Sequence, residues 1–126
     1  MVLYFSNMSE HFELGKKGEQ IAVDYLIKKV YKILERNWRF QKAEIDIIAT
    51  KQKKIISIEV KTRSSKYFGN PQDFVSSKKI KLMVFAMNEY VLMKNLEEEV
   101  RFDIVAVIKN RTSYDIKHFK DAFLYF

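Results

Sequence analysis

The sequence of 126 residues contains no cysteine, only one proline and three glycines, and no long apolar run. Without cysteine, the chain cannot form a disulfide framework, a zinc ribbon or a thiol nucleophile. Its apolar runs of a few residues fall far short of the roughly 20 that a membrane-spanning helix needs. The first residues also lack the basic region and apolar stretch of a secretory signal. We therefore expect a cytoplasmic protein that does not act on a membrane.

Hydrophobic residues make up 48% of the chain and charged residues 31%. This balance is typical of a globular protein and excludes disordered and low-complexity classes. A chain of this length usually folds around one core. We expect one domain over residues 1–126, with residues 1–13 as a flexible or partly helical N-terminal extension.

The formal net charge of +7 is unevenly distributed. The stretch from Lys61 to Lys81 holds six basic residues against one acidic residue. Clustered positive charge beside aromatic rings favours phosphate backbones and unpaired bases. The candidate nucleic-acid contacts in this stretch are Arg63, Lys66, Tyr67, Lys78, Lys79 and Lys81. The alternative is an ordinary solvated loop followed by the start of a helix.

Apolar spacing predicts helices over residues 9–29 and 77–94, the second with Ile80, Val84, Met87 and Val91 on one face. Strands are predicted over residues 31–39, 44–50, 54–62, 101–108 and 114–118. Residues 51–53 would form a short turn, so the second and third strands should pair as an antiparallel hairpin. Gly15 and Gly18 each cost the first helix about 1 kcal/mol relative to alanine, which indicates a close approach there.

Charged residues lie at alternate positions in two otherwise apolar strands: Glu44 and Asp46 in the second, Glu59 and Lys61 in the third. The predicted hairpin brings Asp46 near Glu59, and Lys61 shares a strand face with Glu59. The two carboxylates, with the Val60 carbonyl and waters, offer the oxygen ligands that Mg²⁺ prefers. A lysine beside them could stabilise charge on a phosphate, as metal-assisted phosphodiester hydrolysis requires. The alternative is a plain Glu59–Lys61 ion pair on a solvated sheet face.

Several short stretches recur together in one known family. They are Gly15-Lys16-Lys17-Gly18-Glu19, Asn37-Trp38-Arg39, Glu44-Ile45-Asp46-Ile47-Ile48-Ala49, Glu59-Val60-Lys61-Thr62-Arg63 and Arg101-Phe102-Asp103. With them, the chain from residue 14 onward closely resembles the YraN-type family of small uncharacterised bacterial proteins. That family is similar to the PD-(D/E)XK nucleases, especially the archaeal Holliday junction resolvases. One departure is Ala43, where the family usually has glycine.

The resemblance implies a restriction-endonuclease-like, three-layer α/β domain with a central mixed sheet flanked by helices. Asp46 and Glu59 match the metal-binding acids of such nucleases, and Lys61 matches the catalytic lysine. Glu19 matches a helix glutamate that assists metal or water binding. The implied activity is a Mg²⁺- or Mn²⁺-dependent endonuclease acting on DNA, including branched structures. Two-fold substrates of that kind would suit a homodimer.

Two other functions compete with this one. The first is a non-catalytic nucleic-acid-binding module that retains the nuclease fold. The second is a protein-interaction adaptor that uses the acidic segment Glu97-Glu98-Glu99. Elsewhere, His11 and His118 lack ligand spacing and are interpreted as non-catalytic. Asp103 with Arg101 is interpreted as a structural ion pair.

Overall fold

The computed structural model describes residues 2–64 and 75–123, with side chains from Glu13 onward. Its elements, in chain order, are α1 (Val2–Lys28), β1 (Lys32–Phe40), β2 (Ala43–Lys51), β3 (Lys54–Arg63), α2 (Ser77–Met93), β4 (Glu99–Lys109) and β5 (Tyr114–Phe119). All seven predicted elements are present. The first helix begins at Val2 rather than near Ser9, so the predicted N-terminal extension continues α1.

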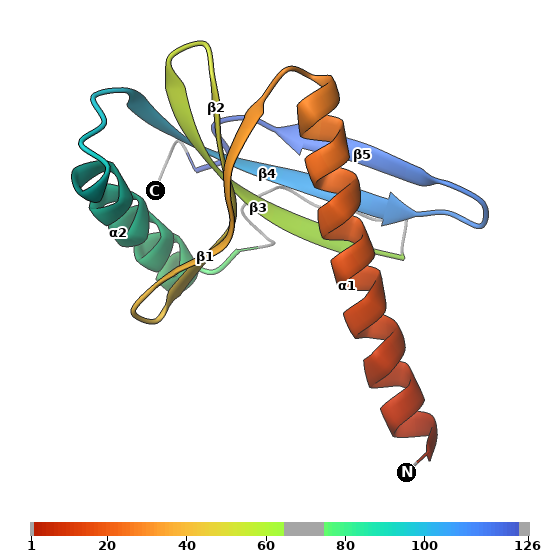
Figure 1. Cartoon of the computed structure of the whole chain (residues 1–126). Helices are drawn as coiled ribbons and strands as arrows, with labels where there is room; N and C mark the ends of the chain where they lie inside the picture. The colour runs from red at the N-terminus through yellow and green to blue at the C-terminus, as the bar shows by residue number, and fades with distance from the viewer. Residues whose placement is uncertain (1, 65–74, 124–126) are drawn as a thin grey trace.

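The five strands form one mixed sheet in the order β1-β2-β3-β4-β5 (Figure 1). The pairs β1–β2, β2–β3 and β4–β5 are antiparallel, and β3–β4 is parallel, with α2 in the connection between them. The three central strands are nearly continuous runs of buried residues, as expected for strands covered on both faces. The edge strands β1 and β5 are largely half-exposed.

The predicted hairpin forms with a shorter turn than expected. Lys51 and Lys54 pair across it, and the turn consists of Gln52 and Lys53 alone. Both have positive φ, at 51° and 62°, which is the backbone of a type I′ turn. This turn matches the twist of the two strands, so it fixes their register over the whole hairpin.

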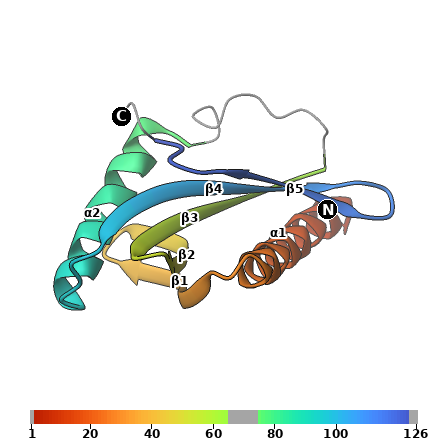
Figure 2. The same ribbon diagram turned by 90° about the horizontal axis from the view of Figure 1, so that it is seen from above.

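The two helices cover opposite faces of the sheet, which gives three layers (Figure 2). On one face, α1 buries Ala22, Val23 and Leu26 against the central strands. On the other face, α2 packs through residues at helical spacing, namely Ile80, Met83, Ala86, Met87 and Tyr90. The fold is therefore α/β, a five-stranded mixed sheet between two helices, as the sequence predicted.

The buried face of α2 differs from the predicted one. Val84 was expected in the core but is 46% exposed, and Val91 is half-buried. Met83 and Tyr90 are buried in their place. Apolar residues surround this helix on all sides, so spacing alone could not identify the inward face.

No helix in the described ranges is long and apolar enough to cross a membrane.

Candidate functional site

Strands β2 and β3 separate at one end, and the separation creates the site. Their ladder runs from Lys51 and Lys54 to Ile47 and Ile58 and then stops. Beyond it, the backbone N–H of Val60 donates to Asp46 Oδ2 at 2.8 Å instead of to a β2 carbonyl. In a strand, the N–H and C=O of one residue point to the same side. The Val60 carbonyl therefore faces this opening together with the Asp46 carboxyl group.

Asp46 and Glu59 are the acidic pair that the sequence predicted to meet across the hairpin. Their carboxyl groups share a hydrogen bond, and Glu59 is only 4% exposed. Burial raises the pKa of Asp46 to about 8, and the hydrogen bond and negative charge of Glu59 contribute to the rise. At neutral pH the pair therefore holds one proton when no cation is bound. A divalent cation would replace that proton.

Lys79 supplies a positive charge to this pair from α2. Its ammonium lies 2.8 Å from Glu59 Oε2. Burial favours the neutral amine, but the hydrogen bond and charge of Glu59 outweigh it and raise the pKa of Lys79. The helix begins just before it: Ser76 caps α2, and its Oγ accepts a hydrogen bond from the Lys79 backbone N–H at 3.1 Å. The sequence suggested a phosphate contact for Lys79 and gave no signal for this ion pair.

Lys61 lies two residues beyond Glu59 on β3 and is half-buried. Burial lowers the pKa of its ammonium, and the nearby carboxylate of Glu59 opposes that shift. Together with Asp46 and Val60, it lines an open cleft of about 620 Å³. Asp46, Val60 and Lys61 thus face the same space, whereas Glu59 lies buried behind them.

Glu19 reaches the same cleft from α1, but it is engaged by other side chains. Its Oε1 accepts a hydrogen bond from Asn37 Nδ2 at 2.9 Å and lies 3.7 Å from Arg36 Nη2. Asn37 adopts the left-handed backbone conformation within β1, which asparagine tolerates better than most residues. Across the described residues, no group of three or more Asp, Glu, His or Cys side chains gathers closely enough to hold a metal ion.

Gly18 explains how α1 comes so close to the cleft. A Cβ atom added there would overlap the side chain of Thr62 on β3. One of the two glycines therefore permits the close approach that the sequence indicated. Gly15 lies about one turn earlier in α1, in the wall of the cleft. A Cβ atom added at Gly15 would have no neighbouring atom within 4 Å.

The oxygen donors of this site suit a hard cation such as Mg²⁺ or Mn²⁺. Mg²⁺ usually takes one or two carboxylates and completes its shell with waters and substrate phosphate oxygens. For such a cation, Asp46 and Glu59 would supply the carboxylates, and the Val60 carbonyl would supply a neutral oxygen. The three predicted metal ligands, Asp46, Glu59 and the Val60 carbonyl, are therefore compatible with a Mg²⁺ shell. Glu19 lines the same cleft but does not belong to the acidic pair.

The predicted nucleic-acid contacts are spread over both sides of this site. Arg63 is exposed in the wall of the cleft, where its Nη1 donates to the Thr62 carbonyl at 3.0 Å. Lys78 and Lys81 are exposed on α2. Lys66 and Tyr67 lie outside the described residues.

A second buried polar cluster joins the last two strands to α1. Asp103 is fully buried and accepts from Arg101 Nη2 at 2.8 Å, which confirms the predicted ion pair. His118 Nε2 lies 2.7 Å from the same carboxylate, and its Nδ1 lies 2.9 Å from Tyr25 Oη. The sequence did not indicate that His118 belongs here, because fifteen residues separate it from Asp103.

Ala43, where the family resemblance leads us to expect glycine, is compatible with its position. It is 3% exposed, begins β2 and does not have positive φ. The left-handed conformation falls on Gln41 instead.

Comparison with known proteins shows similarity to one protein family. Residues 18–107 match the model of the uncharacterised protein family UPF0102. The UPF0102 proteins of Flavobacterium psychrophilum and Christiangramia forsetii are each 58% identical over 119 residues, covering 94% of this chain and 100% of the relative. One from Bacteroides fragilis is 47% identical over 116 residues, covering 92% of this chain and 96% of its own length. Their names state no activity.

Proposed function

We propose that this chain, which belongs to the uncharacterised protein family UPF0102, is a divalent-metal-dependent endonuclease of the PD-(D/E)XK type that acts on DNA. The observation that carries the proposal is the acidic pair Asp46 and Glu59 beside Lys61, at the point where β2 and β3 separate. The three-layer α/β architecture agrees with a restriction-endonuclease-like fold. The net charge of +7 favours an anionic substrate.

Each residue of the site has a proposed task. Asp46 and Glu59 hold Mg²⁺ or Mn²⁺ together with the Val60 carbonyl. When bound, the cation acts as a Lewis acid toward a phosphodiester oxygen. Lys61 contacts the phosphate and stabilises the negative charge that develops on it. Glu19 orients water at the edge of the cleft, held in place by Asn37.

Lys79 has a different task from the phosphate contact that the sequence suggested. Its ammonium neutralises the buried Glu59 carboxylate while no metal is bound. A buried carboxylate without a partner is costly, so this ion pair stabilises the cation-free protein. Metal binding at Glu59 would compete with the Lys79–Glu59 ion pair.

The test is cleavage of a labelled panel that contains a four-way junction, a flap, a linear duplex, a single strand and RNA. Each substrate is incubated with Mg²⁺ or Mn²⁺ and wild type, Asp46→Ala or Asp24→Ala. Asp24 is an exposed acid on α1 and provides the matched control. We expect cleavage by wild type and Asp24→Ala but not by Asp46→Ala, and the substrate that is cut identifies the specificity. Equal cleavage by all three proteins would refute the proposed site.

Lys61→Ala separates catalysis from binding. We expect it to lose cleavage while its DNA affinity, measured in EDTA, changes little, because one of several phosphate contacts is removed. A parallel loss of both would make Lys61 a simple phosphate contact.

The second candidate is a DNA-binding module without catalysis. The observation that favours it is that the described residues gather no group of three metal-binding side chains, because Glu19 is engaged by Asn37 and Arg36 instead. Salt-sensitive DNA binding by wild type without cleavage of any substrate in the panel would support this candidate over the endonuclease.

A further inference from the structure

A second groove lies on the other side of α1 from the acidic cleft. It has a volume of about 980 Å³, against about 620 Å³ for the cleft, and both are lined in part by Leu14 and Lys16. The two therefore lie side by side along the middle of α1.

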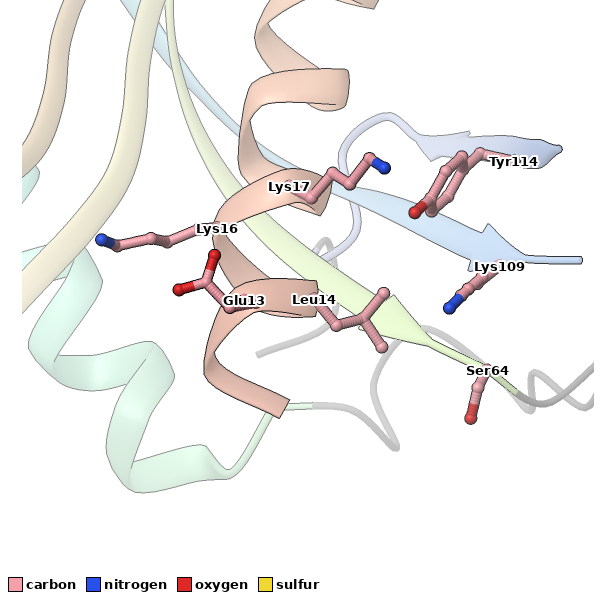
Figure 3. A pocket seen from close by; sticks show the side chains of 7 residues that line it. All are labelled: Glu13, Leu14, Lys16, Lys17, Ser64, Lys109 and Tyr114. Atoms are coloured by element: carbon pink, nitrogen blue, oxygen red, sulfur yellow. The ribbon is translucent and has the colours of Figure 1, made fainter. Parts of the chain in front are cut away.

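The walls of the groove come from four elements. Lys17 extends from α1, Ser64 follows the end of β3, Lys109 ends β4 and Tyr114 begins β5. The parallel register that pairs Arg63 with Ile108 places Ser64 beside Lys109, and Lys109 pairs with Tyr114 across the hairpin. Figure 3 shows the side chains of Lys17 and Tyr114 pointing toward each other, with the Lys109 amine on the same side of the helix.

The polar groups of the groove suit a phosphate backbone. Lys17 and Lys109 are exposed, and the Lys17 ammonium lies 5.7 Å from the centre of the Tyr114 ring. The ring positions the Lys17 ammonium, and the hydroxyl groups of Tyr114 and Ser64 add donors. Lysine ammonium groups and the hydroxyl groups of serine and tyrosine are among the usual protein donors to phosphate oxygens. Among the described residues of this wall Glu13 is the one acid, and Figure 3 shows it pointing to the opposite side of α1 from Lys17.

We propose that this groove binds the sugar–phosphate backbone of the same DNA strand whose phosphodiester lies at the acidic pair. The inference rests on the proposed function, because the reacting phosphate fixes where the strand enters. A strand seated at Asp46 and Lys61 continues on both sides of that phosphate. The shared wall of Leu14 and Lys16 leads it from the cleft into the groove. Lys17 and Lys109 then hold the phosphates that follow.

The test compares two double variants that remove the same charge. Lys17→Gln with Lys109→Gln changes the groove, and Lys28→Gln with Lys32→Gln changes two exposed lysines, one at the C-terminal end of α1 and one at the start of β1. Affinity for a fluorescein-labelled single-stranded 20-mer is measured by anisotropy in EDTA from 50 to 300 mM NaCl. Circular dichroism checks that both variants are folded.

We expect the groove variant to bind on the order of tenfold more weakly at 100 mM NaCl, with a salt slope shallower by about 1.4 for the two lost contacts. The control variant should stay within about twofold of wild type. Equal affinity and equal salt slope in both double variants would overturn the inference. Loss of poly-glutamate binding by the groove variant, with DNA binding unchanged, would also overturn it in favour of an acidic polypeptide.

Cleavage assays separate this inference from the proposed function. If wild type cuts DNA and the groove variant binds and cuts like wild type, the groove inference fails and the endonuclease stands. If wild type cuts nothing while the groove variant alone loses DNA affinity, the endonuclease fails and the groove stands as a nucleic-acid site.

Discussion

The ammonium of Lys79 lies 2.8 Å from the carboxylate of Glu59, a side chain that is only 5% exposed. The two residues come from α2 and β3, so this ion pair connects the helix layer to the acidic pair. It also places a protein cation against one of the two carboxylates that a metal ion would bind. If a metal binds as proposed, the same contact should therefore affect both stability and metal affinity.

Replacing Lys79 by methionine should lower stability and strengthen metal binding. Loss of the ammonium leaves Glu59 buried beside Asp46 without a cation, at a cost of about 1–2 kcal/mol because Lys79 is itself partly exposed. Thermal unfolding in EDTA and with Mn²⁺ measures both effects. The increase in Tm caused by Mn²⁺ should be larger in the variant than in wild type. Lys78→Met, at an exposed neighbour, is the control, and a Lys79 variant that matches it would contradict the assigned role.

Asp46→Asn should change how the stability of the cation-free protein depends on pH. The pKa of Asp46 is about 8 in the folded protein, against about 3.9 in an unfolded chain. A raised carboxyl pKa contributes stability below pH 4 that is lost as pH rises toward 8. Asparagine does not titrate, so the variant should gain stability relative to wild type from pH 5 to 8 and then level off. Urea unfolding in EDTA across this range measures the difference, and a constant difference would show that Asp46 is ionised throughout.

The two glycines of α1 should respond in opposite directions to alanine. At Gly18 the new methyl group overlaps Thr62 and forces helix and strand apart, at a cost of about 1–3 kcal/mol. At Gly15 nothing lies within 4 Å, so alanine should stabilise the helix by about 0.5–1 kcal/mol. Chemical denaturation of both variants measures the two changes. Equal effects at the two positions would contradict the close approach at Gly18.

Arg101→Met should be among the most damaging substitutions in the chain. It removes two hydrogen bonds from Asp103, whose carboxylate is completely buried. His118 and the Asp121 backbone N–H remain, but they leave the charge incompletely satisfied. We expect a loss of about 3 kcal/mol, measured by urea unfolding. Arg111→Met, at an exposed position, serves as the control and should stay near wild type.

The sequence contained enough information for the fold and for half of the site. Strand patterns and the short turn at Gln52 and Lys53 determine which residues face each other, so the meeting of Asp46 and Glu59 was predictable. The same local rules place Lys61 beside them. These are relationships within one hairpin, where sequence spacing translates directly into distance.

The contacts between layers were not predictable in this way. Lys79 meets Glu59, and Asn37 meets Glu19, only because two helices dock on the sheet at particular angles. The inward face of α2 was misjudged at Val84 because both of its faces are apolar. His118 pairs with Asp103 through a strand pairing at the far edge of the sheet. Each depends on tertiary packing that periodicity does not encode.

The order of the strands in the sheet is the same as their order along the chain. Each strand therefore finds its partner in the segment made immediately before it, and only the β3–β4 step spans a helix. Closing the short loop between two such strands costs little conformational entropy. Folds whose contacts are mostly local in sequence also fold quickly. A ribosome releasing this chain would deliver β1, β2 and β3 as a complete meander before α2 is synthesised. The acidic pair would thus be assembled on the nascent chain before Lys79 arrives to neutralise it.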